Sequence, residues 1–417
     1  MRNRIIFLIL FGLTIHFSLK GQGGESPYTF QGIGEIIPPE LTHTIAMGGV
    51  GISNGVIWHL NTKNPALLAK NSLTVFEMAM AGDFRKLVSD TLSRKNASAE
   101  MSYLAFGFPI KSQKWTLSVG YGRFSNVHYS ILTSEILSDD EVLVNTKYDG
   151  SGGLSNVYVS NGFRIGKLLA LGIKASYFFG PITNETTVII DNNLNNQMVL
   201  KDRVSFSDVN FGLGLAYIKP LKDNLFLNFG LTYDLEANIS GKRLRTTETR
   251  IFNGTPISSD TLVDGQKGAI VLPAHTGFGI SLEKSAKWTL GMDVELQTWS
   301  DYRDFDGRDE NLNDSYKINL GGEITPDITS ITSYLKRVTY RLGLNLERTP
   351  FSVNNEQITE IGINFGTSLP VSRFSRLNWA IQLGQRGTSN TIKEEYFKFY
   401  FGITFNDFAW RKRPIYD

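Results

Sequence analysis

The sequence predicts an all-β protein, a transmembrane β-barrel of about fourteen antiparallel strands with an N-terminal plug in its lumen. Three observations support this prediction: long runs of alternating apolar and polar residues, connections that alternate between short and long, and a composition rich in glycine and aromatic residues. The 417 residues include 40 glycines and only 13 prolines, and aromatic residues make up 12% of the chain. This composition differs from that of disordered chains, which are poor in aromatic residues.

The charge balance and the lack of cysteine exclude several classes of protein. The chain has 42 basic and 40 acidic residues, so it offers no basic field for a nucleic-acid partner. The lack of cysteine excludes a disulfide framework, a thiolate metal site and a cysteine nucleophile. The sequence has neither a P-loop nor a G-x-G-x-x-G motif. We therefore expect no cofactor.

Residues 1–21 have the pattern of a cleaved signal peptide. Arg2 and Arg4 precede an apolar run over residues 5–15, which is too short for a spanning helix but suits the core of an export signal. Cleavage is expected near Gly21 and Gln22. The sequence therefore predicts export to the outer membrane of a Gram-negative cell.

Residues 72–410 are predicted to form the barrel, followed by a periplasmic tail over residues 411–417. Residues 288–298 alternate strictly, with Trp288, Leu290 and Met292 on one face and Asp293 on the other. A period of two indicates a strand with one apolar face. The alternating runs reach ten or more residues, as tilted membrane strands require, whereas strands in soluble sandwiches are usually shorter.

The connections predict the number of strands. Six short turns would join twelve strands, and one further strand at each end makes about fourteen, in keeping with the even numbers of bacterial barrels. Short turns are expected in the periplasm and long loops outside the cell. The short turns are expected at residues 109–114, 165–167, 219–224, 283–287, 325–335 and 370–376, and the long loops at 84–97, 135–152, 190–199, 250–267, 304–313, 348–356 and 388–393.

Residues 22–71 are predicted to form a separate segment inside the barrel. They contain Gly32 and Gly34, the pair Pro38 and Pro39, and a glycine-rich stretch over residues 46–51. Glycine and proline interrupt this stretch too often for a membrane strand. Its apolar content is too high for a free tail. The sequence therefore predicts a compact plug in the lumen.

Within this plug, residues 46–51 (Ala-Met-Gly-Gly-Val-Gly), followed by an Asn-Pro-Ala motif, resemble the hatch region of the FadL/TodX family of outer-membrane proteins. The order of Leu272, Pro273, Trp288 and residues 298–300 is similar to the same family. The resemblance implies a fourteen-strand barrel and uptake of hydrophobic molecules. The hatch residues it implies are Gly48, Gly49, Gly51, Asn64, Pro65 and Ala66.

Charged residues at inward positions of the later strands predict a polar network in the lumen. Both signs of charge are present, so these side chains can form ion pairs with one another and hold the plug. The residues are Asp293, Glu295, Lys317, Glu323, Arg341, Glu347, Glu360, Arg386 and Lys398.

Three weaker patterns complete the list of candidate sites. Asp304, Asp306 and Asp309 form a weak calcium candidate in a predicted outer loop, although their spacing is not that of an EF-hand. Thr91 and Thr261 each lie in an Asp-Thr-Leu motif, which resembles the short O-glycosylation signal of Bacteroidota. Residues 51–55 match G-x-S-x-G, but they lie in the predicted plug and not at a strand-to-helix turn, so we expect no enzyme.

Two functions remain open from the sequence. The first is a channel of the FadL type for passive uptake of a hydrophobic small molecule, controlled by movement of the hatch. The alternative is an accessory barrel of a larger complex, for outer-membrane protein assembly (BAM-type) or type 9 secretion. Barrels of the same broad group have such roles in Bacteroidota, and the start near Gln22 and the phenylalanine-rich C-terminal end fit that phylum. The expected partners are outer-membrane lipid in both cases, and other outer-membrane proteins in the second.

Overall fold

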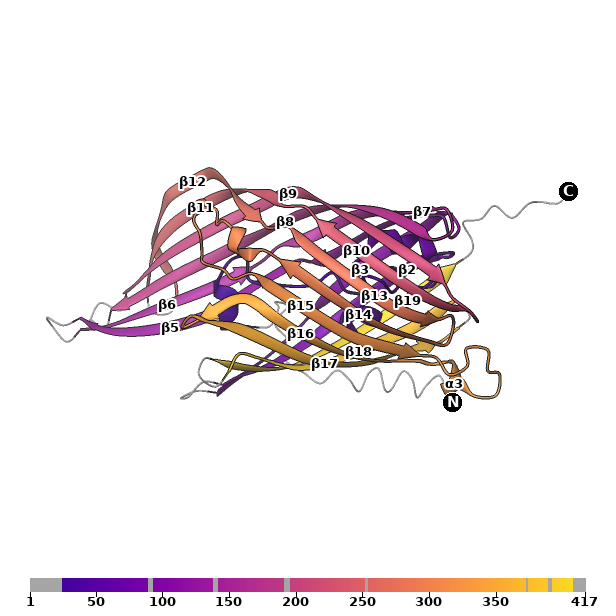
Figure 1. Ribbon diagram of the computed structural model, residues 1–417. Coiled ribbons are helices and arrows are strands. Elements are labelled where there is room, and N and C mark those ends of the chain that lie inside the picture. Colours follow the sequence, from indigo (N-terminus) through magenta and orange to yellow (C-terminus); the bar gives the residue numbers. More distant parts are fainter. Residues whose placement is uncertain are drawn as a thin grey trace.

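The computed structural model describes residues 25–88, 93–137, 142–190, 196–251, 254–372, 374–388 and 392–407. They form a closed antiparallel barrel in which the last strand pairs with the first (Figure 1). The strands that run without a break are β2 (Thr74–Val88), β3 (Ser93–Lys111), β8 (Leu169–Ile190), β9 (Asn196–Pro220), β14 (Trp288–Gln297), β15 (Ser315–Ile324), β16 (Thr339–Val353), β17 (Glu356–Pro370), β18 (Ser375–Arg386) and β19 (Lys393–Asp407).

The other barrel strands are each broken into two pieces, and the second piece continues the wall where the first one ends. One break follows Gly152 and Gly153, whose φ angles of 108° and 127° are open to glycine but not to most other residues. Another break is at Pro273, which has no N–H to donate to a ladder. Counting each broken strand once gives the fourteen strands that the sequence predicts. The broken strands are β4 (Trp115–Arg123) with β5 (Ser125–Leu137), β6 (Val142–Gly152) with β7 (Ser155–Ile165), β10 (Leu225–Asp234) with β11 (Ala237–Ile251), and β12 (Pro256–Leu272) with β13 (His275–Lys284).

The two faces of the wall follow the predicted alternation. On β14, Leu290 and Met292 are exposed on the outside, whereas Thr289 and Asp293 are buried on the inside. On β19, the side chains of the alternating phenylalanines are exposed in the same way. The outward residues form the apolar band that a barrel presents to lipid.

Several of the long polar stretches are paired strands rather than loops, so the sequence prediction is wrong there, whereas residues 304–313 form a loop as predicted. β11 and β12 pair from Ala237↔Leu272 to Arg250↔Pro256, and β5 and β6 pair as far as Leu137↔Val142. β16 and β17 pair as far as Val353↔Glu356. These strands carry polar residues on both faces, so they lack the alternating apolar face by which the sequence analysis identified strands. We call this end of the barrel the long-hairpin end.

The opposite end, which we call the short-turn end, has tight connections. β3 and β4, β7 and β8, and β9 and β10 are joined there by turns of a few residues. The connection between β15 and β16 is longer and contains the short helix α3 (Tyr334–Arg337). At the long-hairpin end, β14 leads through the 3-10 helix η3 (Trp299–Asp301) into an irregular loop before β15.

Residues 25–71 lie inside the barrel, and we call them the lumenal segment (Figure 1). The segment begins toward the long-hairpin end and reaches the short-turn end. Along this path it is mostly irregular backbone. Its short elements are η1 (Pro27–Phe30), β1 (Glu35–Ile36), the helix α2 (Thr42–Ile45) and η2 (Pro65–Lys70).

The start of this segment fills a place where two wall strands separate. β3 pairs with β4 only as far as Tyr103↔Gly122, and within the described ranges residues 93–102 have no strand partner on that side. Instead, β1 pairs with β5, and the Ser26 N–H donates to the carbonyl of His128 at 2.9 Å. The Asn96 side chain on β3 donates to the Glu25 carbonyl at 2.9 Å. The lumenal segment therefore links the two strands from within.

Candidate functional site

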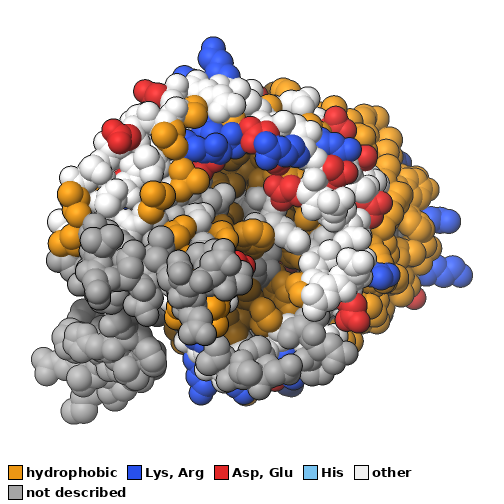
Figure 2. All heavy atoms as spheres, turned by 90° about the vertical axis from the view of Figure 1, so that its left-hand side faces the viewer, with side chains coloured by type: hydrophobic (Ala, Val, Ile, Leu, Met, Phe, Trp, Pro, Cys, Tyr) orange, Lys and Arg blue, Asp and Glu red, His pale blue; other side chains and the backbone are white. Residues whose placement is uncertain are grey.

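A cavity of about 270 Å³ lies between the lumenal segment and the wall. Figure 2, viewed from the long-hairpin end, shows a hollow with hydrophobic side chains inside it and charged side chains along part of its rim. The apolar part of the cavity lining includes Ile36, Pro38, Phe124, Phe178 and Trp299. The remainder carries many charged groups, so the cavity is amphipathic.

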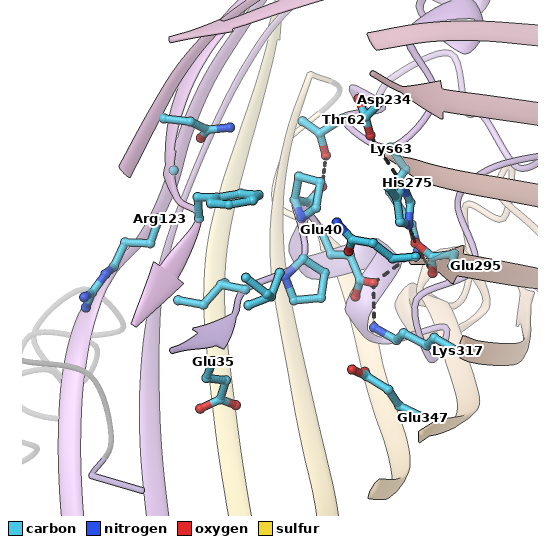
Figure 3. A pocket seen from close by; sticks show the side chains of 18 of the residues that line it. Glu35, Glu40, Thr62, Lys63, Arg123, Asp234, His275, Glu295, Lys317 and Glu347 are labelled. Carbon is cyan, nitrogen blue, oxygen red and sulfur yellow. Dashed lines mark hydrogen bonds and ion pairs between the residues drawn. The ribbon is translucent and has the colours of Figure 1, made fainter. Parts of the chain in front are cut away.

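The first charged cluster is centred on Lys63. Its ammonium group lies 2.8 Å from Glu295, 3.2 Å from Glu40 and 2.8 Å from the Gly49 carbonyl, and Lys317 lies 3.3 Å from Glu40 (Figure 3). Burial would raise the pKa of Glu40, but the charges of Lys317 and Lys63 outweigh it and lower that pKa. Burial likewise opposes the charge on Lys63, yet Glu295 and Glu40 raise the pKa of its ammonium group. These groups are therefore held as ions.

A second cluster is centred on Glu35. Its carboxylate lies 2.7 Å from Arg386, 2.8 Å from Arg85 and 3.4 Å from Lys398. Burial alone would raise the pKa of Glu35, but these three cations hold it well below its usual value. Arg386 also contacts Glu360 at 2.6 Å. This cluster ties β1 to the wall strands β2, β18 and β19.

The glycine-rich stretch is held by one wall carboxylate. Asp293 on β14 accepts hydrogen bonds from the backbone N–H groups of Gly51 at 2.7 Å and Ile52 at 2.8 Å. Gly48 and Gly49 have φ angles of 70° and 96°, which glycine adopts readily. The stretch thus turns sharply and points its N–H groups at the wall.

The Asn-Pro-Ala motif begins η2. The side-chain oxygen of Asn64 (Oδ1) accepts a hydrogen bond from the Ala66 N–H at 3.0 Å, and its side-chain NH2 group donates to the Leu215 carbonyl on β9 at 3.1 Å. Pro65 stands at the first helical position, where its missing N–H costs no hydrogen bond. This motif therefore connects the lumenal segment to the wall.

Close packing against wall glycines holds the segment at the short-turn end. A Cβ atom at Gly343 or Gly321 would overlap the backbone of Met47, and one at Gly172 would overlap Pro65 and Ala66. The segment can approach so closely because these wall positions have no side chain. Its position is thus fixed by both packing and charge.

Other expected residues lie elsewhere. Arg341 pairs with Glu323 at 2.9 Å and with Ser368, outside the residues that line the cavity, whereas Glu347 lies on the cavity wall. Thr261 is exposed on β12, and Thr91 lies outside the described residues.

The three aspartates of the calcium candidate are not brought together. Asp306 contacts Arg243 at 2.7 Å, Asp309 lies 3.7 Å from Arg303, and Asp304 accepts from backbone N–H groups of its own loop. Among the described residues, the group with metal-ligand geometry is His43, His59 and Glu77 instead. The spacing of these residues in the sequence shows no metal motif, so only the fold could identify the group.

A family model describes this chain over its whole length. The model of the family named BamG matches residues 1–417. The chain belongs to the BamG family. A search of curated proteins found no match.

Solved structures show the fold of this BamG-family chain. It is similar to a FadL homologue of Pseudomonas aeruginosa, with a TM-score of 0.60, 10% identity, and coverage of 89% of this chain and 99% of that one. The toluene transporter TodX of Pseudomonas putida aligns with a TM-score of 0.57 and 14% identity, over 87% of this chain and 96% of that one. The sequence resemblance to the FadL/TodX family is thereby confirmed.

The structure also bears on where the protein is located. The fold and its apolar outer band support an outer-membrane location. Among the described residues, no helix combines the length and hydropathy needed to cross a membrane.

Proposed function

We propose that this protein is an accessory barrel subunit of an outer-membrane protein assembly complex and does not itself conduct solutes. The observation that carries the proposal is the match of the BamG model to the full length of the chain. The prefix Bam is the one borne by components of the β-barrel assembly machinery. Fold alone does not decide function, so the likeness to channels leaves this role open.

The anchoring of the lumenal segment supports a non-conducting role. Ion pairs join it to β13 through Lys70 and Glu283 at 2.9 Å, to β14 through Lys63, and to β18 through Glu35. Leaving a buried charge without its partner costs on the order of 3–5 kcal/mol, and opening the lumen would break the buried pairs of both Lys63 and Glu35. A plug that stays in place suits a structural subunit better than a gated channel.

The free edge of β12 supports a docking role. β12 pairs with β11 on one side, and on the other its only β-bridge among the described residues is Val271↔Arg303. Nearly every residue from 256 to 267 is exposed. Unpaired backbone groups along a strand edge can accept a strand from another protein. This edge is therefore a contact surface for a partner of the complex.

Native purification tests the proposal. A tagged copy, extracted from its own outer membrane in mild detergent, should carry the central barrel of the assembly machinery in stoichiometric amount. Depletion of the protein should lower the level of other folded outer-membrane barrels. A second FadL-type barrel from the same membrane, tagged in the same way, is the control. A monomer without that partner, and unchanged barrel levels on depletion, would contradict the proposal.

A channel for a hydrophobic small molecule is the second candidate, and the amphipathic cavity favours it. Apolar ligands are held in largely preformed, mostly apolar pockets. If the protein is a channel, its deletion should slow uptake of a hydrophobic compound while other barrels keep their normal levels. The purified barrel in vesicles should restore that uptake.

A further inference from the structure

We propose that His43, His59 and Glu77 form a binding site for one divalent transition-metal ion, with zinc as the occupant that fits best. The three residues come from different places: His43 from α2, His59 from the loop before η2, and Glu77 from wall strand β2. All three are buried. This site is independent of the proposed function and of the cavity.

The distances among the three groups suit a shared ion. The His59 Nδ1 atom lies 3.2 Å from one oxygen of Glu77, and the His43 Nδ1 atom lies 4.0 Å from the other. One ligand atom from each residue can be chosen so that all lie within 4.8 Å of one another. Two ligand atoms that bind a tetrahedral zinc ion lie about 3.3 Å apart, so small side-chain rotations would complete the geometry.

The two imidazoles lie against each other beside the carboxylate. Their ring centroids are 4.2 Å apart in a stacked arrangement. Stacking engages the faces of the rings, so the nitrogen lone pairs in the ring planes stay available for coordination.

Hydrogen bonding within the described residues leaves this cluster incomplete. His43 Nδ1 and the Oε2 atom of Glu77 are buried without a hydrogen-bond partner there. Unpaired buried polar atoms are costly, and native structures usually satisfy them. Two histidines with one carboxylate form a ligand set that zinc uses in proteins. A metal ion would give both of these atoms a partner.

The charge balance points the same way. The Glu77 carboxylate, with no exposed surface, accepts from the Leu60 N–H at 2.9 Å. Two basic side chains of this region have other partners: Arg341 pairs with Glu323, and Arg376 lies over the Trp58 ring. Burial disfavours a carboxylate ion unless a positive charge compensates it. A divalent cation between the rings supplies it.

An ion at this place would join the lumenal segment to the wall. The cluster lies near the short-turn end, where Glu77 stands opposite Thr404 and close to the start of β2. Ile57 is exposed and Trp58 is half-buried, and both immediately precede His59 in the chain. An ion therefore has a short path to the cluster from the solvent at the short-turn end. The metal would bind two parts of the segment to one wall strand, in addition to the ion pairs described above.

Metal analysis of the full-length protein tests this inference. Protein purified from outer membranes and dialysed without chelator should contain close to one zinc ion per barrel, as measured by inductively coupled plasma mass spectrometry. After chelation, added Co²⁺ should give the intense visible absorption of a tetrahedral site. H59Q and E77Q should each lose the metal and this absorption by at least tenfold. H275Q is the matched control, because His275 is also a lumenal histidine but lies beside Asp234 and Glu295.

The wild-type protein alone can overturn the inference. It would be refuted if the purified barrel carried no divalent transition metal and, after chelation, bound neither Zn²⁺ nor Co²⁺. Metal retained by both H59Q and E77Q would refute it as well. The folded state of each variant is checked by its heat-modifiable migration on gels, so that loss of metal is not mistaken for loss of fold.

Discussion

The two halves of the lumen hold the same segment in different ways. At the short-turn end, the backbone of Met47 and the η2 helix rest directly on wall glycines such as Gly343 and Gly172. Toward the long-hairpin end, charged side chains such as Glu35 and Lys63 make the contacts, and a cavity remains between them. Close packing fixes the position of the lumenal segment and leaves no space beside it, whereas the ion pairs leave a cavity between the segment and the wall. We therefore expect any ligand to bind in the half where ion pairs hold the segment.

The largest expected effect comes from the centre of the ion-paired half. Lys63→Ala would leave Glu40 and Glu295 buried without their shared cation, so the free energy of unfolding should fall by about 3–5 kcal/mol. Lys70→Ala is the control, because Lys70 and Glu283 are more exposed and their pair should contribute less. Urea unfolding in detergent, followed by tryptophan fluorescence, measures both variants. Equal losses would contradict the central role of Lys63.

The packed half is probed by filling a glycine position. Gly343→Ala should lower the free energy of unfolding by about 1–3 kcal/mol, because its Cβ atom would overlap the backbone of Met47 and Gly48. At Gly82 a Cβ atom would lie 3.6 Å from Phe84, an ordinary contact, so Gly82→Ala should be nearly neutral. The same urea titration compares the two. A neutral Gly343→Ala would show that the segment is loosely seated.

A smaller effect is expected outside the lumen, at the rim. Arg243 contacts Asp306 at 2.7 Å and its guanidinium lies 4.5 Å from the centre of the Phe305 ring. Arg243→Ala should release the loop over residues 304–313 and speed its cleavage in limited proteolysis, with barrel stability changed by less than about 1 kcal/mol. Arg308→Ala, at an exposed residue 3.9 Å from Asp306, should leave cleavage unchanged. If Arg243→Ala is cleaved at the same rate as the wild-type protein, Arg243 does not hold this loop.

The orientation of the two ends can be tested by cysteine labelling. The chain has no cysteine, so single substitutions give clean labelling sites. Asp306→Cys at the long-hairpin end should react with a membrane-impermeant thiol reagent on whole cells, whereas Ser372→Cys at the short-turn end should react only after the cells are opened. The reverse pattern would invert the topology.

The wall could be predicted from the sequence because its physics is local. Alternation with period two identifies Leu290 as outward and Asp293 as inward, and both face as expected. The extended hairpins were missed because residues 256–267 are polar on both faces, so no alternation marks them. Pairing with a neighbouring strand, which a single run of sequence does not reveal, makes them strands.

The sequence predicted that ion pairs form in the lumen, but not which residues form them. Inward charges on β14 and β18 implied ion pairs, but their partners Lys63 and Glu35 lie in a segment without periodicity. The cluster of His43, His59 and Glu77 was missed, since these residues are 16 and 18 positions apart and meet only through the fold. Irregular backbone positions its side chains by tertiary contacts, which leave no pattern in the sequence.

The central claim is that the lumenal segment stays in place while the protein works. A disulfide can test it, because a Cβ atom at Gly402 would lie 2.8 Å from the Thr42 hydroxyl oxygen, close to the separation of about 3 Å between one sulfur and the Cβ atom of its partner in a disulfide. Cells that rely on the Thr42→Cys and Gly402→Cys double variant should assemble outer-membrane barrels equally well with the bond formed or reduced, with each single variant as control. Loss of this activity on oxidation, restored by a reductant, would show that the segment must move and would contradict the account.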